Sequence, residues 1–505
     1  MQTTAPTPHP TPAPRVRSRL DRSRRAGVLA VAALAALTLG AKLVSRLADT
    51  TSYASLVAPP AAATAGDGRV TLAAAADRGA VLHGGDGLLK LQLTLAGNDV
   101  GGPARRLPTD FVVVLDHSGS MGGRKIVDAR EAVAGLIDRL APTDRFALVV
   151  YDSVAEVSIA LGVATPEARR RWQAIAAQVE PRGGTALSLG LDAALDLVAG
   201  RRDAGAARIV LLSDGLANEG DVTRSGLLGR AGRATSWGVP VTTIGVGEDF
   251  DESLMGSLAD AGSGNFYFLR DTVALAQVFE GELGATRQTV AEALAVEIEP
   301  GPGVVVVDAA GYPVERRGSR AVFRPGSLFA GQERRLWLTL RVPADELGER
   351  PLGTVLARYR SGGEDFAIEP VAAGEVATVA DRAAYLSGID RDRWERAVVE
   401  EEYGRLQQEV AEHVKAGRQA EAKEEIAVYK AKNEKLNASL GSQEVADNLE
   451  AVDALASEVD DAFVGPDQGS KQNRLSKARQ ASAWDGRRQG AKLPPASPKP
   501  GGGSN

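Results

Sequence analysis

An apolar run that ends in alternating oxygen-bearing side chains is the most informative feature of this sequence. Residues 111–115 read Phe-Val-Val-Val-Leu, and Asp116, Ser118 and Ser120 follow at every second position. Such a run predicts a buried central strand. Side chains two residues apart on an extended segment point to the same side, so these three oxygens can face one ion while His117 points away. The pattern therefore predicts part of a metal site.

Two further oxygen ligands follow later in the chain. Thr185 ends a glycine loop before a predicted helix at 186–199, and Asp214 ends a second apolar run at 207–213. Hydroxyl and carboxylate oxygens favour Mg²⁺, Mn²⁺ or Ca²⁺ over Zn²⁺ or copper. Each residue alone has a simpler explanation, because Asp, Ser and Thr commonly cap helices or form turns. The five together predict a metal site, with Mg²⁺ as the first choice and Mn²⁺ or Ca²⁺ as alternatives.

Apolar runs alternate with helical patterns throughout residues 109–284. This alternation predicts an α/β fold, with a doubly wound, mostly parallel sheet covered by helices on both faces. Ligands of such sheets bind at the carboxyl ends of the strands, which is where all five candidate ligands lie. We expect strands at 111–116, 146–151, 154–161, 208–213, 239–246 and 265–269, and helices at 124–140, 166–179, 186–199, 221–237, 251–261 and 272–283.

Residues 109–284 resemble a von Willebrand factor type A (VWA) domain, a Rossmann-like fold. The five candidate ligands match all five positions of its metal-ion-dependent adhesion site, and His117 is a mild departure at a position that the pattern leaves free. The resemblance implies that an acidic residue of a protein partner completes the metal shell. Asp116 and Asp214 would then hold charge and geometry, partly through water, while Ser118, Ser120 and Thr185 coordinate directly. Met121 and Asn218 are expected to shape the rim of the site, and packing is the alternative explanation for either. Segments at 140–146, 183–185, 212–218, 244–247 and 264–267 resemble the bacterial subgroup similar to inter-alpha-trypsin inhibitor heavy chains.

Alternating strand patterns flank this domain on both sides. Residues 67–108 contain Leu89-Lys90-Leu91-Gln92-Leu93, and residues 285–380 contain several similar stretches. The few strands on the amino-terminal side cannot form a stable sheet alone. We therefore expect one β-sandwich assembled from both flanks, with the α/β domain inserted between its strands. Two separate small β units are the alternative.

The carboxyl-terminal part changes in composition. Residues 381–465 are rich in Glu, Lys and Ala and have helical periodicity broken near Gly417 and Gly441, which predicts a helical hairpin or three-helix bundle. A buried core is the preferred interpretation of its apolar positions, and partner binding is the alternative. Residues 466–505 are Gly-, Ser-, Pro- and Lys/Arg-rich without apolar periodicity, so we expect a disordered basic tail.

The amino terminus predicts export. Residues 1–25 form a basic tail that we expect to be disordered, residues 26–47 contain an Ala/Leu-rich segment, and residues 48–66 form a linker. The apolar segment is interpreted as an uncleaved membrane anchor, with a cleaved signal segment as the alternative. Under the positive-inside rule the bulk of the chain is then extracytoplasmic, in the periplasm or at the cell surface, or else secreted.

The function that these features favour is metal-dependent binding of a protein ligand that presents Glu or Asp, with no enzymatic activity. The net charge of −6 argues against a nucleic-acid partner. The sequence has four His and no Cys, and it contains no motif that would place a general base or nucleophile beside the ion. A scaffold subunit of a membrane-associated assembly that works with an ATPase is the main alternative, and a metal-dependent hydrolase is the weaker one.

Overall fold

The computed structural model describes residues 57–98, 108–199, 206–247, 249–270 and 272–487. The expected basic tail at 1–25, the apolar segment at 26–47 and residues 48–56 of the linker lie outside these residues. Within the described ranges, no helix is both long and apolar enough to cross a bilayer.

The α/β domain contains a six-stranded sheet in the order β10-β9-β8-β5-β6-β7. All neighbours pair in parallel except β6 and the edge strand β7, which are antiparallel. The prediction of a mostly parallel sheet is therefore confirmed. The strands are β5 (Thr109–Asp116), β6 (Arg145–Tyr151), β7 (Ala155–Val163), β8 (Ala206–Ser213), β9 (Val241–Val246) and β10 (Ser263–Leu269).

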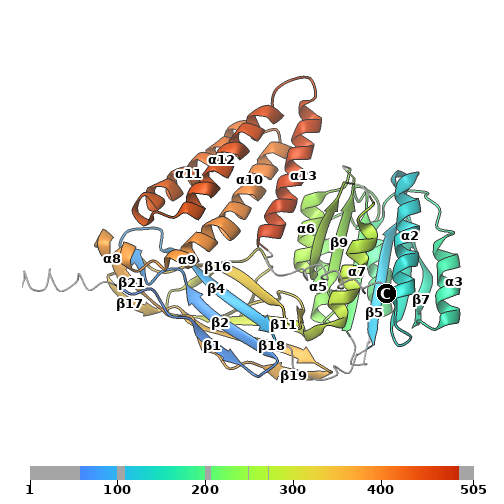
Figure 1. The fold of residues 1–505 in the computed structure, drawn as a ribbon, viewed down its shortest axis with the longest axis horizontal. Coiled ribbons are helices and arrows are strands. Elements are labelled where there is room, and N and C mark those ends of the chain that lie inside the picture. Colours follow the sequence, from blue (N-terminus) through green and yellow to red (C-terminus); the bar gives the residue numbers. More distant parts are fainter. Residues whose placement is uncertain (1–56, 99–107, 200–205, 248, 271, 488–505) are drawn as a thin grey trace, which may run out of the picture. The chain divides into compact units, whose positions relative to one another are not determined.

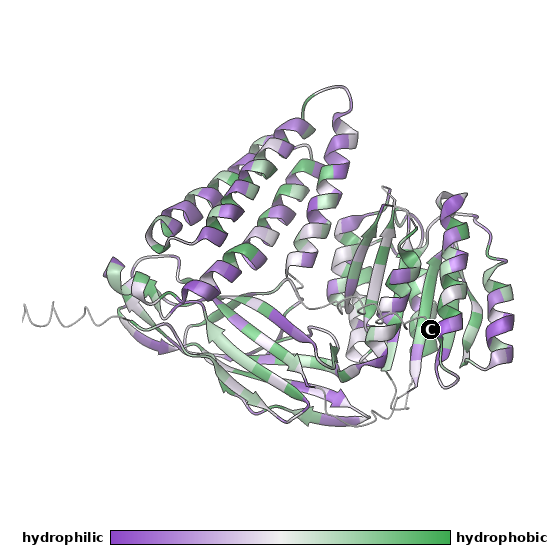
Figure 2. Cartoon of the chain, in the orientation of Figure 1, coloured by the Kyte–Doolittle hydropathy of each residue, from purple (hydrophilic) through white to green (hydrophobic). Residues whose placement is uncertain are grey.

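Helices cover both faces of this sheet (Figure 1). Phe111, Val113 and Leu115 of β5 pack in one core with α2, α3 and α7, whereas Val112 and Val114 pack with α4, α5 and α6. Because successive strand side chains point to opposite faces, an unbroken apolar run serves both cores. Figure 2 shows this apolar character along β5. The helices are η1 (Gly119–Met121), α2 (Arg124–Arg139), α3 (Pro166–Ala176), α4 (Leu187–Val198), α5 (Arg224–Ser236), α6 (Glu252–Ala261) and α7 (Leu275–Arg287).

Strands from both sides of the α/β domain join in one sheet, in the order β1-β2-β4-β16-β12. β4 pairs antiparallel with β16, although the whole α/β domain separates them in the sequence. A second sheet has the order β13-β14-β11-β18-β19, and a third, small sheet the order β17-β21-β3. The strands are β1 (Ala63–Gly66), β2 (Val70–Ala76), β3 (Ala80–Leu82), β4 (Leu88–Gly97), β11 (Thr289–Pro300), β12 (Val305–Ala309), β13 (Glu315–Arg317), β14 (Arg320–Phe323), β15 (Leu328–Phe329), β16 (Glu333–Arg341), β17 (Gly348–Pro351), β18 (Gly353–Ser361), β19 (Glu364–Ala367), β20 (Val371–Ala372) and β21 (Glu375–Val379).

The two larger sheets share one core, in which Leu91 and Leu93 of β4 lie with Val296 and Ile298 of β11. The α/β domain is thus inserted in a β-sandwich, as expected. The prediction of a linker over residues 48–66 is wrong at its end, because residues 63–66 form edge strand β1 and pair with β2. The small side chains of residues 63–66 show no alternating apolar pattern, and the strand forms because its backbone pairs with β2.

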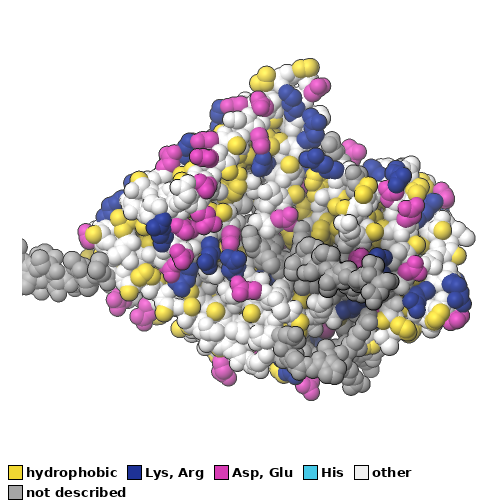
Figure 3. Space-filling model, in the orientation of Figure 1, with side chains coloured by type: hydrophobic (Ala, Val, Ile, Leu, Met, Phe, Trp, Pro, Cys, Tyr) yellow, Lys and Arg dark blue, Asp and Glu magenta, His cyan; other side chains and the backbone are white. Residues whose placement is uncertain are grey.

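Several helices follow the sandwich. Figure 3 shows positively and negatively charged side chains interspersed over the visible face of the molecule. Arg335 Nη1 of β16 lies 2.9 Å from Glu400 Oε1, and Trp337 Nε1 donates to Glu400 Oε2, so the helical region contacts the sandwich. The helices are α8 (Arg382–Ser387), α9 (Arg391–Arg396), the π-helix η2 (Ala397–Glu402), α10 (Tyr403–Lys415), α11 (Gln419–Leu440), α12 (Gln443–Ala462) and α13 (Gln468–Arg487).

Helix α13 corrects the prediction of a disordered tail at 466–505 for residues 468–487, and residues 488–505 of that tail lie outside the described residues. Trp484 is 3% exposed and belongs to the core between the sheet and α4–α6, and its Nε1 donates to Asp260 Oδ1 at 3.0 Å. Lys477 is 2% exposed and pairs with Glu252 at the start of α6, with 2.7 Å between Nζ and Oε2. The helix also packs along α10, so it is ordered by contacts with other helices and with the α/β domain rather than by apolar periodicity of its own. This explains why the sequence did not predict it.

Candidate metal centre

The turn after β5 brings the first three predicted ligands together. Asp116 is the last residue of β5, and Ser118 precedes the short helix η1, which contains Ser120. The Ser118 N–H donates to Asp116 Oδ1 at 2.8 Å, and the hydroxyl oxygens of Ser118 and Ser120 lie 3.0 Å apart. The backbone thus folds back so that both hydroxyls lie beside the strand end.

The other two predicted ligands meet this turn. The Ser120 hydroxyl donates to Asp214 Oδ1 at 2.7 Å. A Cβ atom built on Gly215 would lie 3.4 Å from Ser120 Oγ and 3.6 Å from Thr185 Oγ1, so both hydroxyls border the same small space. Gly119 N–H also donates to the carbonyl of Gly183 at 3.2 Å, which holds the Thr185 loop against the turn. The structure therefore gathers all five predicted residues at the carboxyl edge of the sheet.

Hydrogen bonds from the protein hold the carboxylate of Asp116 in place. Ser213 Oγ donates to Asp116 Oδ2 at 2.7 Å, and Tyr151 OH lies 3.4 Å from the same oxygen. Burial raises the pKa of Asp116, and the nearby charge of Asp214 acts in the same direction, while hydrogen bonds from Ser118 and Ser213 oppose it. A divalent cation beside these oxygens would favour the ionised form. The donor set therefore fits a hard cation.

The loop that carries Thr185 has two supports, of which the sequence analysis missed Asp152 and expected Asn218 only as a rim residue. Thr185 N–H donates to Asn218 Oδ1 at 2.8 Å, so Asn218 positions the loop. Asp152, which follows β6, accepts from Arg182 Nε at 2.7 Å, and its carbonyl accepts from Ala186 N–H at 2.6 Å. Burial disfavours the charge on Asp152, but bonds from the Val154 N–H and Arg182 lower its pKa below the usual value. The sequence did contain a signal for Asp152, because this carboxylate directly follows a buried strand, as Asp116 does.

Two expectations about neighbours of the ligands have different outcomes. His117 points away from the ligand hydroxyls, as predicted, since its Nδ1 lies 2.8 Å from the carbonyl of Glu180 and its Nε2 lies 3.8 Å from Asp152 Oδ2. Met121, which the sequence analysis assigned to the rim, is fully buried in the core with α2, α3 and α7. The rim assignment is therefore wrong for Met121.

Lys125, which the sequence analysis did not single out, reaches the site from the first turn of α2. Its Nζ lies 2.5 Å from Asp214 Oδ2. Asp214 is fully buried, whereas the Lys125 side chain is 28% exposed. One cationic side chain thus partly neutralises the two carboxylates.

The site opens to solvent on one side. Asp116, Ser118, Thr185 and Asp214 are buried, but Ser120 is exposed. Exposed apolar side chains lie on loops at the same edge of the sheet, namely Val154, Leu216 and Val222. An external group could therefore reach the hydroxyl cluster and contact an apolar rim.

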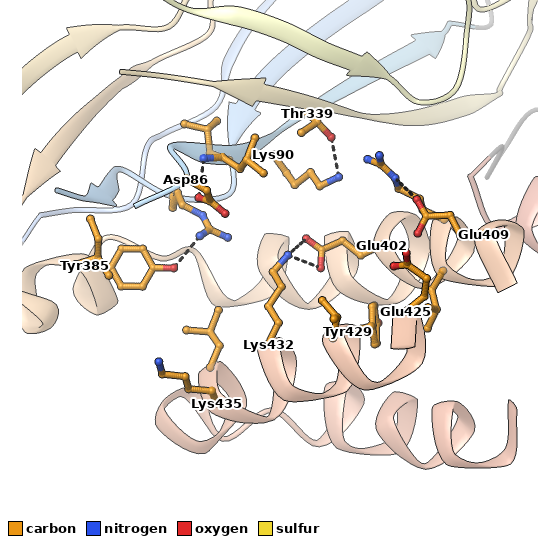
Figure 4. A pocket seen from close by; sticks show the side chains of 18 of the residues that line it. Asp86, Lys90, Thr339, Tyr385, Glu402, Glu409, Glu425, Tyr429, Lys432 and Lys435 are labelled. Atoms are coloured by element: carbon orange, nitrogen blue, oxygen red, sulfur yellow. Dashed lines mark hydrogen bonds and ion pairs between the residues drawn. The ribbon is translucent and has the colours of Figure 1, made fainter. Parts of the chain in front are cut away.

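A separate cavity of about 450 Å³ lies between the sandwich and the helices (Figure 4). Its charged groups bind one another: Lys432 Nζ lies 2.9 Å from Glu402 Oε1, and Arg405 Nε lies 3.1 Å from Glu409 Oε1. Lys90 Nζ donates to Thr339 Oγ1 at 2.8 Å. These pairs satisfy the polar groups of a contact surface, so we place the candidate function at the sheet edge instead.

Over the described ranges, no group of three or more His, Cys, Asp or Glu side chains forms a metal cluster, and the sheet-edge site itself has two carboxylates.

Comparison with known proteins identifies the domain. The von Willebrand factor type A domain family matches residues 110–281. A solved structure described as von Willebrand factor type A from Catenulispora acidiphila aligns over 85% of this chain and 97% of its own, with a TM-score of 0.62 and 16% identity. That likeness shows a shared fold. Residues 110–281 therefore form a VWA domain, and domains of this family typically mediate protein–protein interaction or adhesion and commonly bind a divalent metal.

Sequence relatives support the same assignment. An uncharacterized protein of Synechocystis is 28% identical over 272 residues, which cover 50% of this chain and 62% of the relative. Human inter-alpha-trypsin inhibitor heavy chain H4 is 29% identical over 160 residues, covering 30% of this chain and 17% of that protein. A third relative, E3 ubiquitin-protein ligase WAV3 of Arabidopsis thaliana, is 27% identical over 254 residues, covering 48% and 32%. The chain thus spans less than two thirds of each of these relatives.

Proposed function

We propose that this protein binds a protein partner through a divalent cation, Mg²⁺ or alternatively Mn²⁺ or Ca²⁺, held by Asp116, Ser118, Ser120, Thr185 and Asp214. One observation carries the proposal: three hydroxyls and two buried, hydrogen-bonded carboxylates converge at a sheet edge with one open side. The cation would supply a Lewis-acid position for an external carboxylate. The partner would present a Glu or Asp side chain there.

A surface ion binds an isolated carboxylate weakly, because the carboxylate must lose hydration. Affinity must therefore also come from contacts around the site. Leu216 and Val154 are each 56% exposed, which is unusual for side chains of this size beside a polar site. We infer that the partner's acidic residue has apolar neighbours that cover this rim.

The location of the protein is part of the proposal. The basic residues before the Ala/Leu-rich segment at 26–47 favour a membrane-anchored chain with an extracytoplasmic body. Cleavage and secretion are the alternative. A scaffold role within a membrane-associated assembly remains compatible with the same binding site.

Partner capture with and without chelator tests the proposal. The whole chain would be immobilised and exposed to membrane extract of the source organism in Mg²⁺. We expect a bound protein that chelator releases, and that Ser118→Ala fails to retain because one ligand is lost. Ser158→Ala, which changes a half-buried serine on edge strand β7, is the matched control and should retain it. Equal capture by Ser118→Ala, or capture unaffected by chelator, would rule out metal-bridged binding.

A further inference from the structure

Lys125 places a positively charged side chain at the amino-terminal end of helix α2, where the helix dipole disfavours one. It lies in the first turn of α2, after the N-cap Gly123, and that turn contains no acidic residue. The helix dipole makes an ammonium at this end unfavourable. The ion pair with Asp214 offsets that cost, which indicates that the position of Lys125 is set by the metal centre rather than by the helix.

The ion pair uses one oxygen of Asp214 and leaves the other to the ligand cluster. Asp214 Oδ1 accepts from Ser120 Oγ at 2.7 Å, while Oδ2 accepts from Lys125 Nζ at 2.5 Å. Lys125 Nζ also lies 3.5 Å from the carbonyl oxygen of Ser120, so the ammonium borders the ligand turn. A Cβ atom on Gly247 would lie 3.5 Å from Lys125 Nζ, so the loop after β9 borders the ammonium. The positive charge of Lys125 can therefore remain beside the site when a metal ion binds there.

We propose that Lys125 sets the charge of the loaded centre so that it selects an anionic ligand. The two carboxylates cancel the charge of a divalent cation, and a neutral centre would hold water and a carboxylate with little preference. With Lys125 present the centre keeps one net positive charge, which attracts a carboxylate. The same charge repels the cation, so Lys125 also weakens metal binding and keeps the ion exchangeable. This inference rests on the proposed function and adds the residue that determines the ligand class.

The test uses the whole chain with Mn²⁺ as the metal and acetate as the carboxylate probe, at constant ionic strength. Mn²⁺ affinity is measured by calorimetry, and displacement of Mn²⁺-bound water by acetate is measured by water proton relaxation. In Lys125→Met we expect Mn²⁺ to bind roughly tenfold more tightly and acetate roughly tenfold more weakly. Acetamide, the uncharged analogue of acetate, should bind wild type and variant alike. Lys125→Arg keeps the charge and should resemble wild type.

Arg124→Met is the matched control, because it removes the same charge from the preceding residue, whose side chain is 80% exposed and paired with Asp128. Its Mn²⁺ and acetate affinities should stay close to wild type. If Lys125→Met leaves Mn²⁺ affinity unchanged or weakens it, while Mn²⁺ still binds the wild type, Lys125 merely positions Asp214 and the inference is overturned. If the wild type binds no Mn²⁺, the proposed function itself fails, and this inference with it.

Discussion

Replacement of Asp214 by Asn is expected to lower the Mn²⁺ affinity of the whole chain at least about a hundredfold. The change keeps the shape of the side chain but removes one of the two carboxylate charges that face the hydroxyl cluster. Ser120 and Lys125 would both lose a charged acceptor, so the geometry of the site would loosen as well. Calorimetric titration with Mn²⁺ measures the loss directly.

A stability measurement gives an independent readout of the same change. Because a ligand that binds the folded state stabilises it by mass action, Mn²⁺ at a hundredfold excess over its Kd should add about 2.7 kcal/mol to the wild type. Asp214→Asn should lose this gain. Asp196→Asn, on the exposed side of α4, is the control and should keep it. A full Mn²⁺ effect in Asp214→Asn would place the ion elsewhere.

Replacement of Lys477 by Met is expected to release α13 from the α/β domain. Lys477 and Glu252 are 2% and 1% exposed, and Lys477 Nζ also donates to the carbonyl of Phe250 at 2.6 Å. Removing one partner of a buried ion pair costs about 3 to 5 kcal/mol, because the other charge stays buried. Lys415 Nζ lies 3.1 Å from Glu252 Oε1 and would compensate in part, so we expect the lower end of that range. Hydrogen exchange of the α13 amides measures the release.

A control for the Lys477 variant lies on the same helix. Arg474→Met removes an exposed charge from α13 and should leave its exchange unchanged.

The ion pair of Lys477 and Glu252 also predicts a pH dependence. Burial alone would raise the pKa of Glu252, but the hydrogen bond and charge of Lys477 hold it below the usual value. A lowered folded-state pKa stabilises at pH values above the unfolded pKa, and this contribution is lost as pH falls through the folded pKa. In the wild type, α13 should therefore loosen below about pH 4. If the protection factors of the α13 amides, which correct for the intrinsic pH dependence of exchange, are the same at pH 3 as near neutral pH, the pair does not hold the helix.

The sequence predicted the clustering of the five candidate ligands because each of them follows a strong local signal. Asp116 and Asp214 end unbroken apolar runs, and Thr185 follows two glycines, so parallel-sheet geometry was enough to bring them together. The antiparallel pairing of β7 and the supports supplied by Asp152 and Asn218 were not predicted. Those depend on side chains and loops that meet only in three dimensions.

A β-sandwich assembled from both flanks was predicted because the alternating leucines of residues 89–95 need a partner sheet, but the specific pairing of β4 with β16 was not. Helix α13 was missed for the opposite reason. Its order depends on packing against α10, α12 and α6, including the contacts of Lys477 and Trp484 with α6, and its polar composition shows no apolar stripe. Contacts between distant segments override local propensity at such places.

Anomalous diffraction from crystals of the whole chain soaked in Mn²⁺ tests the central claim most directly. We expect one strong peak at the carboxyl edge of the sheet, within bonding distance of the hydroxyl oxygens of Ser118, Ser120 and Thr185, with a coordination position open toward solvent. The peak should be absent in Asp214→Asn crystals grown in the same way. A Mn²⁺ peak at another place, or an undiminished peak in Asp214→Asn, would contradict the assignment of this metal centre.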